Sequence, residues 1–138
     1  MPCGVYRCVL MLGALAIKIP RLRQLSDGMR SNRWEREMWH TWRPIFRWTT
    51  LCPVYLADPL GLVVIMPRAT QPVSREKIDA MPDYYPDITS ETKIEDHGRL
   101  DATIVALDYG LPHEDMVLSR REYYRQRAAS APAAVVPK

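Results

Sequence analysis

Cysteine and histidine are scarce in this chain, and so are long apolar runs. The 138 residues include three cysteines and three histidines. Neither residue type falls at the spacing of a metal site, and the odd number of cysteines argues against a disulfide framework. We therefore expect free thiols and a cytoplasmic location, where thiols stay reduced. The apolar run "CVLMLGALA" is too short to cross a membrane, so we expect no membrane partner.

The same apolar run raises a second alternative, a secretion signal. It follows Arg7 and ends in "ALA" at residues 14–16, which has the form of a signal-peptidase site. However, the apolar pattern continues through Ile17 and Ile19, with Lys18 between them. A strand that runs through the supposed cleavage site explains this pattern better.

The composition is that of a globular protein. Apolar residues make up 47 % of the chain and charged residues 25 %, and the formal net charge is +3. Basic side chains cluster between Lys18 and Arg47, among four tryptophans. Without a recognised binding motif, this cluster is more typical of a solvated helix face, and the tryptophans are more typical of a core. A basic, aromatic nucleic-acid-binding protein stays open as an alternative.

Hydrophobic periodicity and turn residues predict one α+β domain at residues 1–127 and a flexible tail at 128–138. Ser26 or Asp27 can cap a helix that stops before Pro44, and an irregular loop is expected at 82–101 because this segment is acidic and interrupted by proline. In chain order, we expect strands at 5–11 and 14–19, a helix at 28–42, a hairpin that turns at 58–61, a helix at 74–81 capped by Ser74, a strand from 104 to Asp108, and a helix at 114–127.

A lysine and a glutamate stand out on this frame because both lie among apolar residues. Lys18 sits inside the strand "LAIKIP", where its ammonium group is costly unless it reaches solvent or an anion. Glu35 shares a helix face with Met38, Trp39 and Trp42. A carboxylate on the buried side of a helix, packed against a strand with a buried lysine, predicts an ion pair. Since a buried ion pair is weak evidence for stability, we look for its purpose in function.

Five segments occur in an order that resembles the protein-kinase fold. "ALAIKIP" resembles the V-A-I-K strand, and the helix of Glu35 resembles the kinase helix whose glutamate pairs with that lysine. "LGLVVIMPRA" is similar to the last N-lobe strand running into the hinge. "ETKIEDHG" resembles the catalytic-loop pattern D-x-K-x-x-N, and "ALDYG" resembles D-F-G. The resemblance covers residues 4–112 and is closest to small kinase-like proteins of bacteria and phages.

The resemblance implies a minimal kinase-like fold and an ATP site with Mg²⁺. Residues 1–69 would form an N-lobe with an antiparallel sheet of about five strands and one packed helix, and residues 70–127 a reduced C-lobe. The implied roles are phosphate binding by Lys18 held by Glu35, nucleotide contacts from the hinge residues Met66 and Ala69, metal binding by Asp96 and Asp108, proton acceptance by Glu91, and stabilisation of the transferred phosphoryl group by Lys93.

The sequence departs from the kinase pattern in three ways, and two hypotheses about its function stay open. The chain has no G-x-G-x-x-G loop and no H-R-D motif, and the segment after Gly110 is too short for a full C-lobe. A kinase-like phosphotransferase with an unknown acceptor, either a small molecule or a protein, is our first hypothesis. The alternative is a catalytically inactive pseudokinase that acts as a nucleotide-binding or protein-interaction module.

Overall fold

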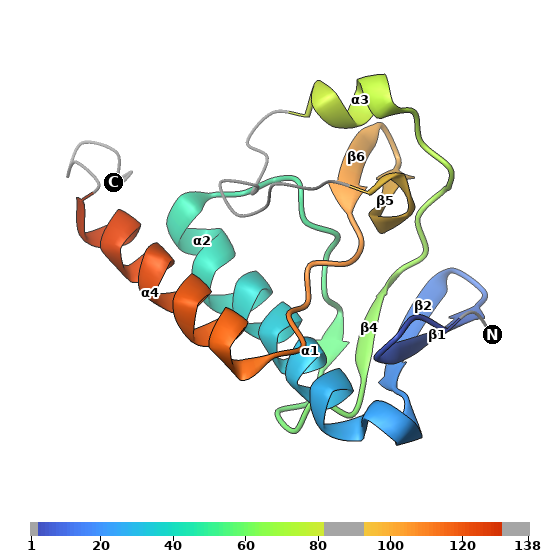
Figure 1. The fold of residues 1–138 in the computed structure, drawn as a ribbon. Helices are drawn as coiled ribbons and strands as arrows, with labels where there is room; N and C mark the ends of the chain where they lie inside the picture. The colour runs from blue at the N-terminus through green and yellow to red at the C-terminus, as the bar shows by residue number, and fades with distance from the viewer. Residues whose placement is uncertain (1–2, 82–92, 131–138) are drawn as a thin grey trace.

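The computed structural model describes residues 3–81 and 93–130, which form an α+β structure with two antiparallel sheets (Figure 1). The larger sheet has four strands in the order β1-β2-β4-β3, and the smaller sheet is the pair β5-β6. The strands are β1 (Arg7–Leu12), β2 (Leu15–Pro20), β3 (Leu56–Ala57), β4 (Val64–Pro67), β5 (His97–Leu100) and β6 (Thr103–Ala106). The antiparallel α+β class is as predicted, although the larger sheet has four strands rather than five.

The β1–β2 hairpin confirms the first predicted strand pair. Its turn contains Gly13, whose φ of 59° lies in the left-handed region that glycine adopts without steric cost. The register pairs Val9 with Lys18 and Met11 with Ala16. Directly paired residues project to the same face of a sheet, so Lys18 shares its face with alternate residues of β1.

The long helical segment runs from Leu25 to Phe46 in three parts. These parts are α1 (Leu25–Glu37), the π-helical η2 (Met38–Trp42) and α2 (Arg43–Phe46). The helix was predicted to stop before Pro44, but proline is tolerated in the first turn of α2 because its missing N–H is not needed there. The helical segment ends at Arg47, which adopts a left-handed conformation with φ 58°. The short η1 (Leu22–Gln24) precedes α1 in the chain. α1 packs against β2.

The segment after residue 92 contains a strand where an irregular loop was predicted. The short η3 (Ile94–Asp96) leads into β5, which pairs with β6 and turns at Asp101. The sequence of β5, "HGRL", contains a glycine and one strongly apolar residue, so its own β-propensity is low. Pairing with β6 decides its conformation, because strand formation depends more on neighbours than on intrinsic preference.

Two further helices complete the fold. Ser74 caps α3 (Arg75–Asp79) by accepting a hydrogen bond from the N–H of Lys77, as predicted. The last helix, α4 (Glu114–Ser130), runs beside α1 (Figure 1) and extends three residues into the predicted tail. Tyr124 of α4 stacks on Trp34 of α1. Three of the four tryptophans are buried as predicted, at 2 %, 6 % and 8 % exposure for Trp34, Trp42 and Trp48.

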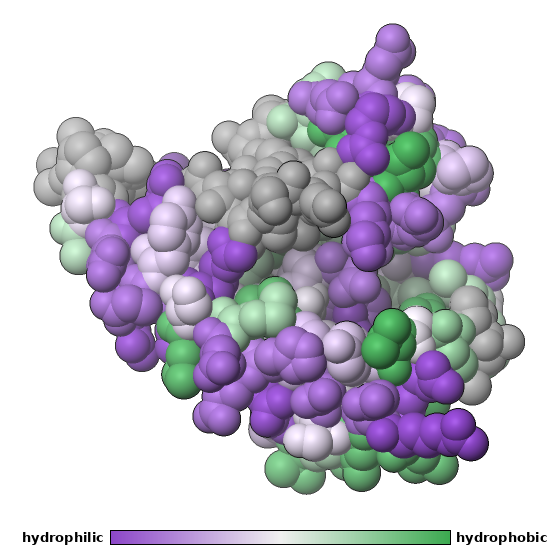
Figure 2. All heavy atoms as spheres, in the orientation of Figure 1, coloured by the Kyte–Doolittle hydropathy of each residue, from purple (hydrophilic) through white to green (hydrophobic). Residues whose placement is uncertain are grey.

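The cysteines differ from the prediction of free thiols. Cys3 and Cys8 form a disulfide, and Cys52 is a buried thiol. Among the described residues, no helix is both long and apolar enough to cross a membrane. The face seen in Figure 2 is mainly hydrophilic, with hydrophobic residues in separate groups.

Candidate functional site

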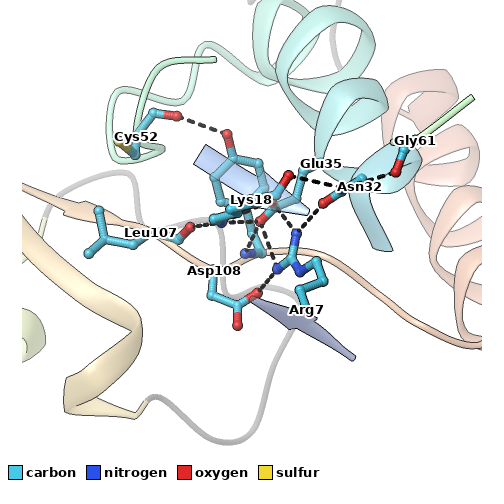
Figure 3. A network of polar contacts seen from close by, with 9 residues as sticks. Arg7, Lys18, Asn32, Glu35, Cys52, Gly61, Leu107 and Asp108 are labelled. Atoms are coloured by element: carbon cyan, nitrogen blue, oxygen red, sulfur yellow. Dashed lines mark hydrogen bonds and ion pairs between the residues drawn. The ribbon is translucent and has the colours of Figure 1, made fainter. Parts of the chain in front are cut away.

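Lys18 and Glu35 form the predicted ion pair. The two-residue period of β2 turns Lys18 toward α1, and its Nζ donates to both carboxylate oxygens of Glu35 at 2.9 Å. Both residues are buried, with 5 % exposure for Lys18 and none for Glu35. Lys18 also donates to the backbone carbonyl of Leu107. The pair therefore joins the sheet, α1 and the segment after β6 at one point (Figure 3).

Arg7 is a member of this site that sequence reasoning missed. Its guanidinium donates to Glu35 Oε1 at 2.6 Å, to Asn32 Oδ1 at 2.9 Å and to Asp108 Oδ1 at 2.5 Å. Figure 3 shows this guanidinium between the two carboxylates. Two cations and two carboxylates thus form a charge-neutral quartet, defined here as Arg7, Lys18, Glu35 and Asp108. The sequence contained a usable signal, because the hairpin register places Arg7 on the face of Lys18.

The tyrosine and glycine after Asp108 hold this aspartate against α1. The backbone N–H of Tyr109 donates to Glu35 Oε2 at 3.0 Å, and its hydroxyl donates to the carbonyl of Cys52 at 2.8 Å. A Cβ on Gly110 would overlap Ser31 Oγ and would lie 2.8 Å from the Ser31 carbonyl oxygen. Glycine is therefore required by close approach to α1 rather than by a sharp turn.

The β5–β6 hairpin brings Asp96 and Asp108 near each other. His97 pairs with Ala106, and just outside this pair the N–H of Leu107 donates to the Asp96 carbonyl at 2.7 Å. Asp96 immediately precedes β5, and Asp108 follows β6 by two residues. A two-stranded ladder therefore fixes both aspartates at its open end, although they are twelve positions apart in the chain.

The two aspartates have opposite pKa shifts. Burial and then the charge of Asp108 raise the pKa of Asp96 to about 6. Burial acts to raise the pKa of Asp108 as well, but the charges of Arg7 and Lys18 outweigh it and hold that pKa below its usual value. The Asp108 side chain is half exposed, so it is accessible from the solvent side. Asp96 thus senses the charge of Asp108, and Asp108 has the stronger cationic partners.

A cleft of about 550 Å³ brings most of the predicted site residues together. Its lining includes the hairpin face that carries Val9, Ala16 and Lys18, together with both aspartates. Six predicted residues line it: Lys18, Met66, Ala69, Lys93, Asp96 and Asp108. Glu35 is fully buried and does not line the cleft itself, but it accepts a hydrogen bond from Lys18. Glu91, the predicted proton acceptor, lies outside the described residues.

The residues of this cleft fit a magnesium ion only together with a ligand. Among residues 3–81 and 93–130, no three carboxylate, histidine or cysteine side chains are grouped so that they could hold a metal. Two carboxylates with hard oxygens are nevertheless what Mg²⁺ takes from a protein when phosphates supply further ligands. The raised pKa of Asp96 reflects in part its repulsion by Asp108, which a divalent cation would relieve. Asp96 and Asp108 therefore suit Mg²⁺ bound with a phosphorylated molecule.

The lining of the cleft is partly apolar and partly charged. Val9, Ala16 and Met66 offer an apolar surface on the sheet, and Lys93 adds a further cation near Asp96. Such a surface next to cations and carboxylates suits a ligand with an aromatic base and phosphates. Searches with this chain against protein-family models, curated proteins and solved structures give no match.

Proposed function

We propose that the cleft binds ATP with Mg²⁺ and that the chain is a kinase-like phosphotransferase. The observation that carries this proposal is the convergence of the Lys18–Glu35 pair with Asp96 and Asp108 on one cleft. The order of motifs along the chain had singled out the same four residues. In that arrangement an ammonium group and two carboxylates surround the place where phosphates and a cation would neutralise one another.

Each residue has a role that follows from its position. Lys18 would bind the nucleotide phosphates as a point charge, and Glu35 fixes its direction. Met66 and Ala69 would contact the base from the sheet side of the cleft. Asp96 and Asp108 would hold the metal, which supplies charge neutralisation when bound.

Two further residues, Lys93 and Glu91, would act in phosphoryl transfer itself. Lys93 lines the cleft beside the aspartates, and its charge would stabilise the transferred phosphoryl group. Glu91, two residues before Lys93, remains the proposed acceptor of the proton from the attacking hydroxyl. The acceptor molecule itself is left open.

A lysine substitution tests nucleotide binding. Lys18→Met keeps the packing of the side-chain stem and deletes the charge, so we expect calorimetric affinity for Mg·ATP to fall by about tenfold or more. Arg7 still pairs with Glu35 in this variant, so we expect it to be less stable than the wild type but still folded. Lys77→Met on the exposed α3 is the matched control and should bind as the wild type does. Equal affinities for Mg·ATP in the wild type and Lys18→Met would refute the assignment of Lys18.

A second candidate is the nucleotide-binding pseudokinase, and the Arg7–Asp108 ion pair favours it. At 2.5 Å, Arg7 occupies one oxygen of the proposed metal ligand. An enzyme would have to exchange this contact for Mg²⁺, whereas a binding module would not. Release of labelled phosphate from ATP, or its transfer to the chain itself, separates the candidates: turnover supports the phosphotransferase, and binding without turnover supports the pseudokinase.

The nucleic-acid alternative has less support. Trp34, Trp42 and Trp48 lie in the core and do not offer their faces to bases.

A further inference from the structure

A second cleft lies on the other side of α1 from Glu35. Its volume is about 630 Å³, and it lies between the α1–η2 segment and α4. The α1 residues that line it include Arg30, Arg33 and Glu37, which follow one helical face. The residues of α1 that are buried toward the sheet, such as Ser31 and Glu35, follow the opposite face. The two clefts are therefore separate sites on one helix.

The lining of this second cleft is strongly basic. Five arginines line it: Arg30, Arg33, Arg36, Arg121 and Arg125. Among the described residues, its only acidic side chains are two glutamates, and one of them, Glu37, already accepts two hydrogen bonds from Arg121 at 2.8 and 3.0 Å. Two more arginines have carboxylate partners outside the lining: Arg30 pairs with Asp27 at 3.0 Å, and Arg125 with Glu122 at 3.8 Å. Among the described residues, the cleft arginines without an ion pair are Arg33 and Arg36. We name this set of five residues the arginine cleft.

Backbone carbonyls, not carboxylates, hold several of these arginines in place. Arg33 donates to the Leu60 carbonyl at 3.0 Å and Arg36 to the Ala57 carbonyl at 3.2 Å. Within the described part of the chain, no carboxylate forms an ion pair with either of them. A guanidinium has five N–H donors, so one carbonyl leaves its charge and its other donors available. Arg33 and Arg36 are thus positioned without being neutralised.

Apolar side chains in the lining of the arginine cleft strengthen its electrostatic attraction for anions. Trp34, Trp42 and Val117 are buried apolar side chains at its base. Charges act more strongly over a low-dielectric wall than in open water. Because both tryptophan rings are buried, they do not offer stacking surfaces for a nucleic-acid strand.

We propose that the arginine cleft binds a small ligand that carries two or more phosphate groups. Its volume lies within the usual range for small-molecule sites of about 300–1,000 Å³. Arginine pairs with phosphate through parallel hydrogen bonds, and two phosphate groups on one molecule match the unpaired charges of Arg33 and Arg36. We call the cleft that Lys18, Asp96 and Asp108 line the nucleotide cleft, after its proposed ligand. The arginine cleft is independent of it, because in the part of the chain that the structure describes none of the five arginines lines the nucleotide cleft.

Inorganic tripolyphosphate is a suitable probe, used without magnesium at fixed ionic strength in a calorimetric titration of the full chain. We expect Arg33→Gln/Arg36→Gln to weaken its binding by about tenfold. The matched control is Arg23→Gln/Arg68→Gln, which removes the same charge from two exposed arginines outside both clefts. Equal weakening in the two double variants would mean non-specific attraction and overturn the proposal.

Two further measurements test where the phosphates bind and which anion the arginine cleft prefers. Lys18→Met should leave tripolyphosphate binding within about twofold of the wild type. If that variant loses binding and the arginine variant does not, the phosphates bind in the nucleotide cleft and the proposal fails. A polyglutamate peptide that binds as tightly as tripolyphosphate would also overturn it, in favour of an acidic protein partner. If the double variant does not fold, Arg125→Gln replaces it, with the same expected direction, because the Arg125 side chain is 64 % exposed.

Discussion

Arg7 connects two carboxylates that lie far apart in the sequence. It begins β1, yet its charge is used by Glu35 on α1 and by Asp108 after β6. Arg7 is 8 % exposed and Glu35 is fully buried, so the charge of Glu35 is compensated by two cations rather than by water. At the scale of single residues, the site is therefore an electrostatic unit in which no member can be removed without loss to another.

Removal of Arg7 should destabilise the fold. Arg7→Gln leaves buried Glu35 with Lys18 alone, and we expect a loss of about 3 kcal/mol in the free energy of unfolding, measured with urea. Arg7→Lys keeps a charge and should retain part of this energy. Arg23→Gln is the control on the surface, with an expected change within about 0.5 kcal/mol. A loss as small as that of the control would show that the quartet contributes little to stability.

Asp96 should destabilise the protein near neutral pH. Its pKa is raised to about 6 from the ordinary 3.8, so between these values the folded state holds a proton that the unfolded chain has already released. The contribution of this carboxyl to stability therefore falls as pH rises from about 4 to about 6 and stays low above that. After discounting for solvent screening, we expect Asp96→Asn to stabilise the protein by about 1 kcal/mol at pH 7 and hardly at all near pH 4.

Denaturant unfolding of Asp96→Asn and the wild type across this pH range checks the prediction. Asp79→Asn, at an exposed position of α3, is the control at pH 7, with an expected change within about 0.5 kcal/mol. A gain at pH 4 as large as that at pH 7 would contradict the assigned ionisation of Asp96.

At the scale of elements, the helices and strands that could be predicted from the sequence are those with a clear apolar pattern and a clear turn. The β1–β2 hairpin consists of two apolar runs on either side of Gly13, and the face of α1 that carries Glu35 follows helical spacing. The ion pair of Lys18 could be predicted because both residues are charged among apolar neighbours. β5 could not, because its four residues carry little β-propensity of their own. Arg7 was missed because its role depends on strand register and on a segment about a hundred positions away.

The contact between α1 and the segment after β6 should depend on the absence of a side chain. In Gly110→Ala the new Cβ would meet the Ser31 backbone and hydroxyl, so α1 or Asp108 must shift. We expect a loss of about 2 kcal/mol in unfolding free energy and weaker Mg·ATP binding. Gly4→Ala is the control, since its Cβ would meet only the Arg7 carbonyl oxygen at 3.7 Å, an ordinary contact. Stability equal to that of the control would contradict this packing.

For the whole molecule, α1 is the shared wall of two clefts with different charge. The nucleotide cleft contains charges of both signs, whereas the arginine cleft is mainly positive. The net charge of +3 is mild and gives no hint of this separation. Because the distribution of charge over the two faces of one helix depends on how that helix packs against β2 and α4, composition alone could not predict it.

The charge neutrality of the quartet also determines how two ligands would affect each other's affinity for the cleft. In the proposed function, free ATP would bring several negative charges to a cleft whose cations already have carboxylate partners, and free Mg²⁺ would meet an aspartate already paired with Arg7. Each ligand alone must break an ion pair, but the two together replace the contacts that they disrupt. Thermodynamic linkage then requires each to raise the affinity for the other by the same factor. A cleft with the proposed function would therefore bind the Mg·ATP complex much more tightly than free ATP or free Mg²⁺.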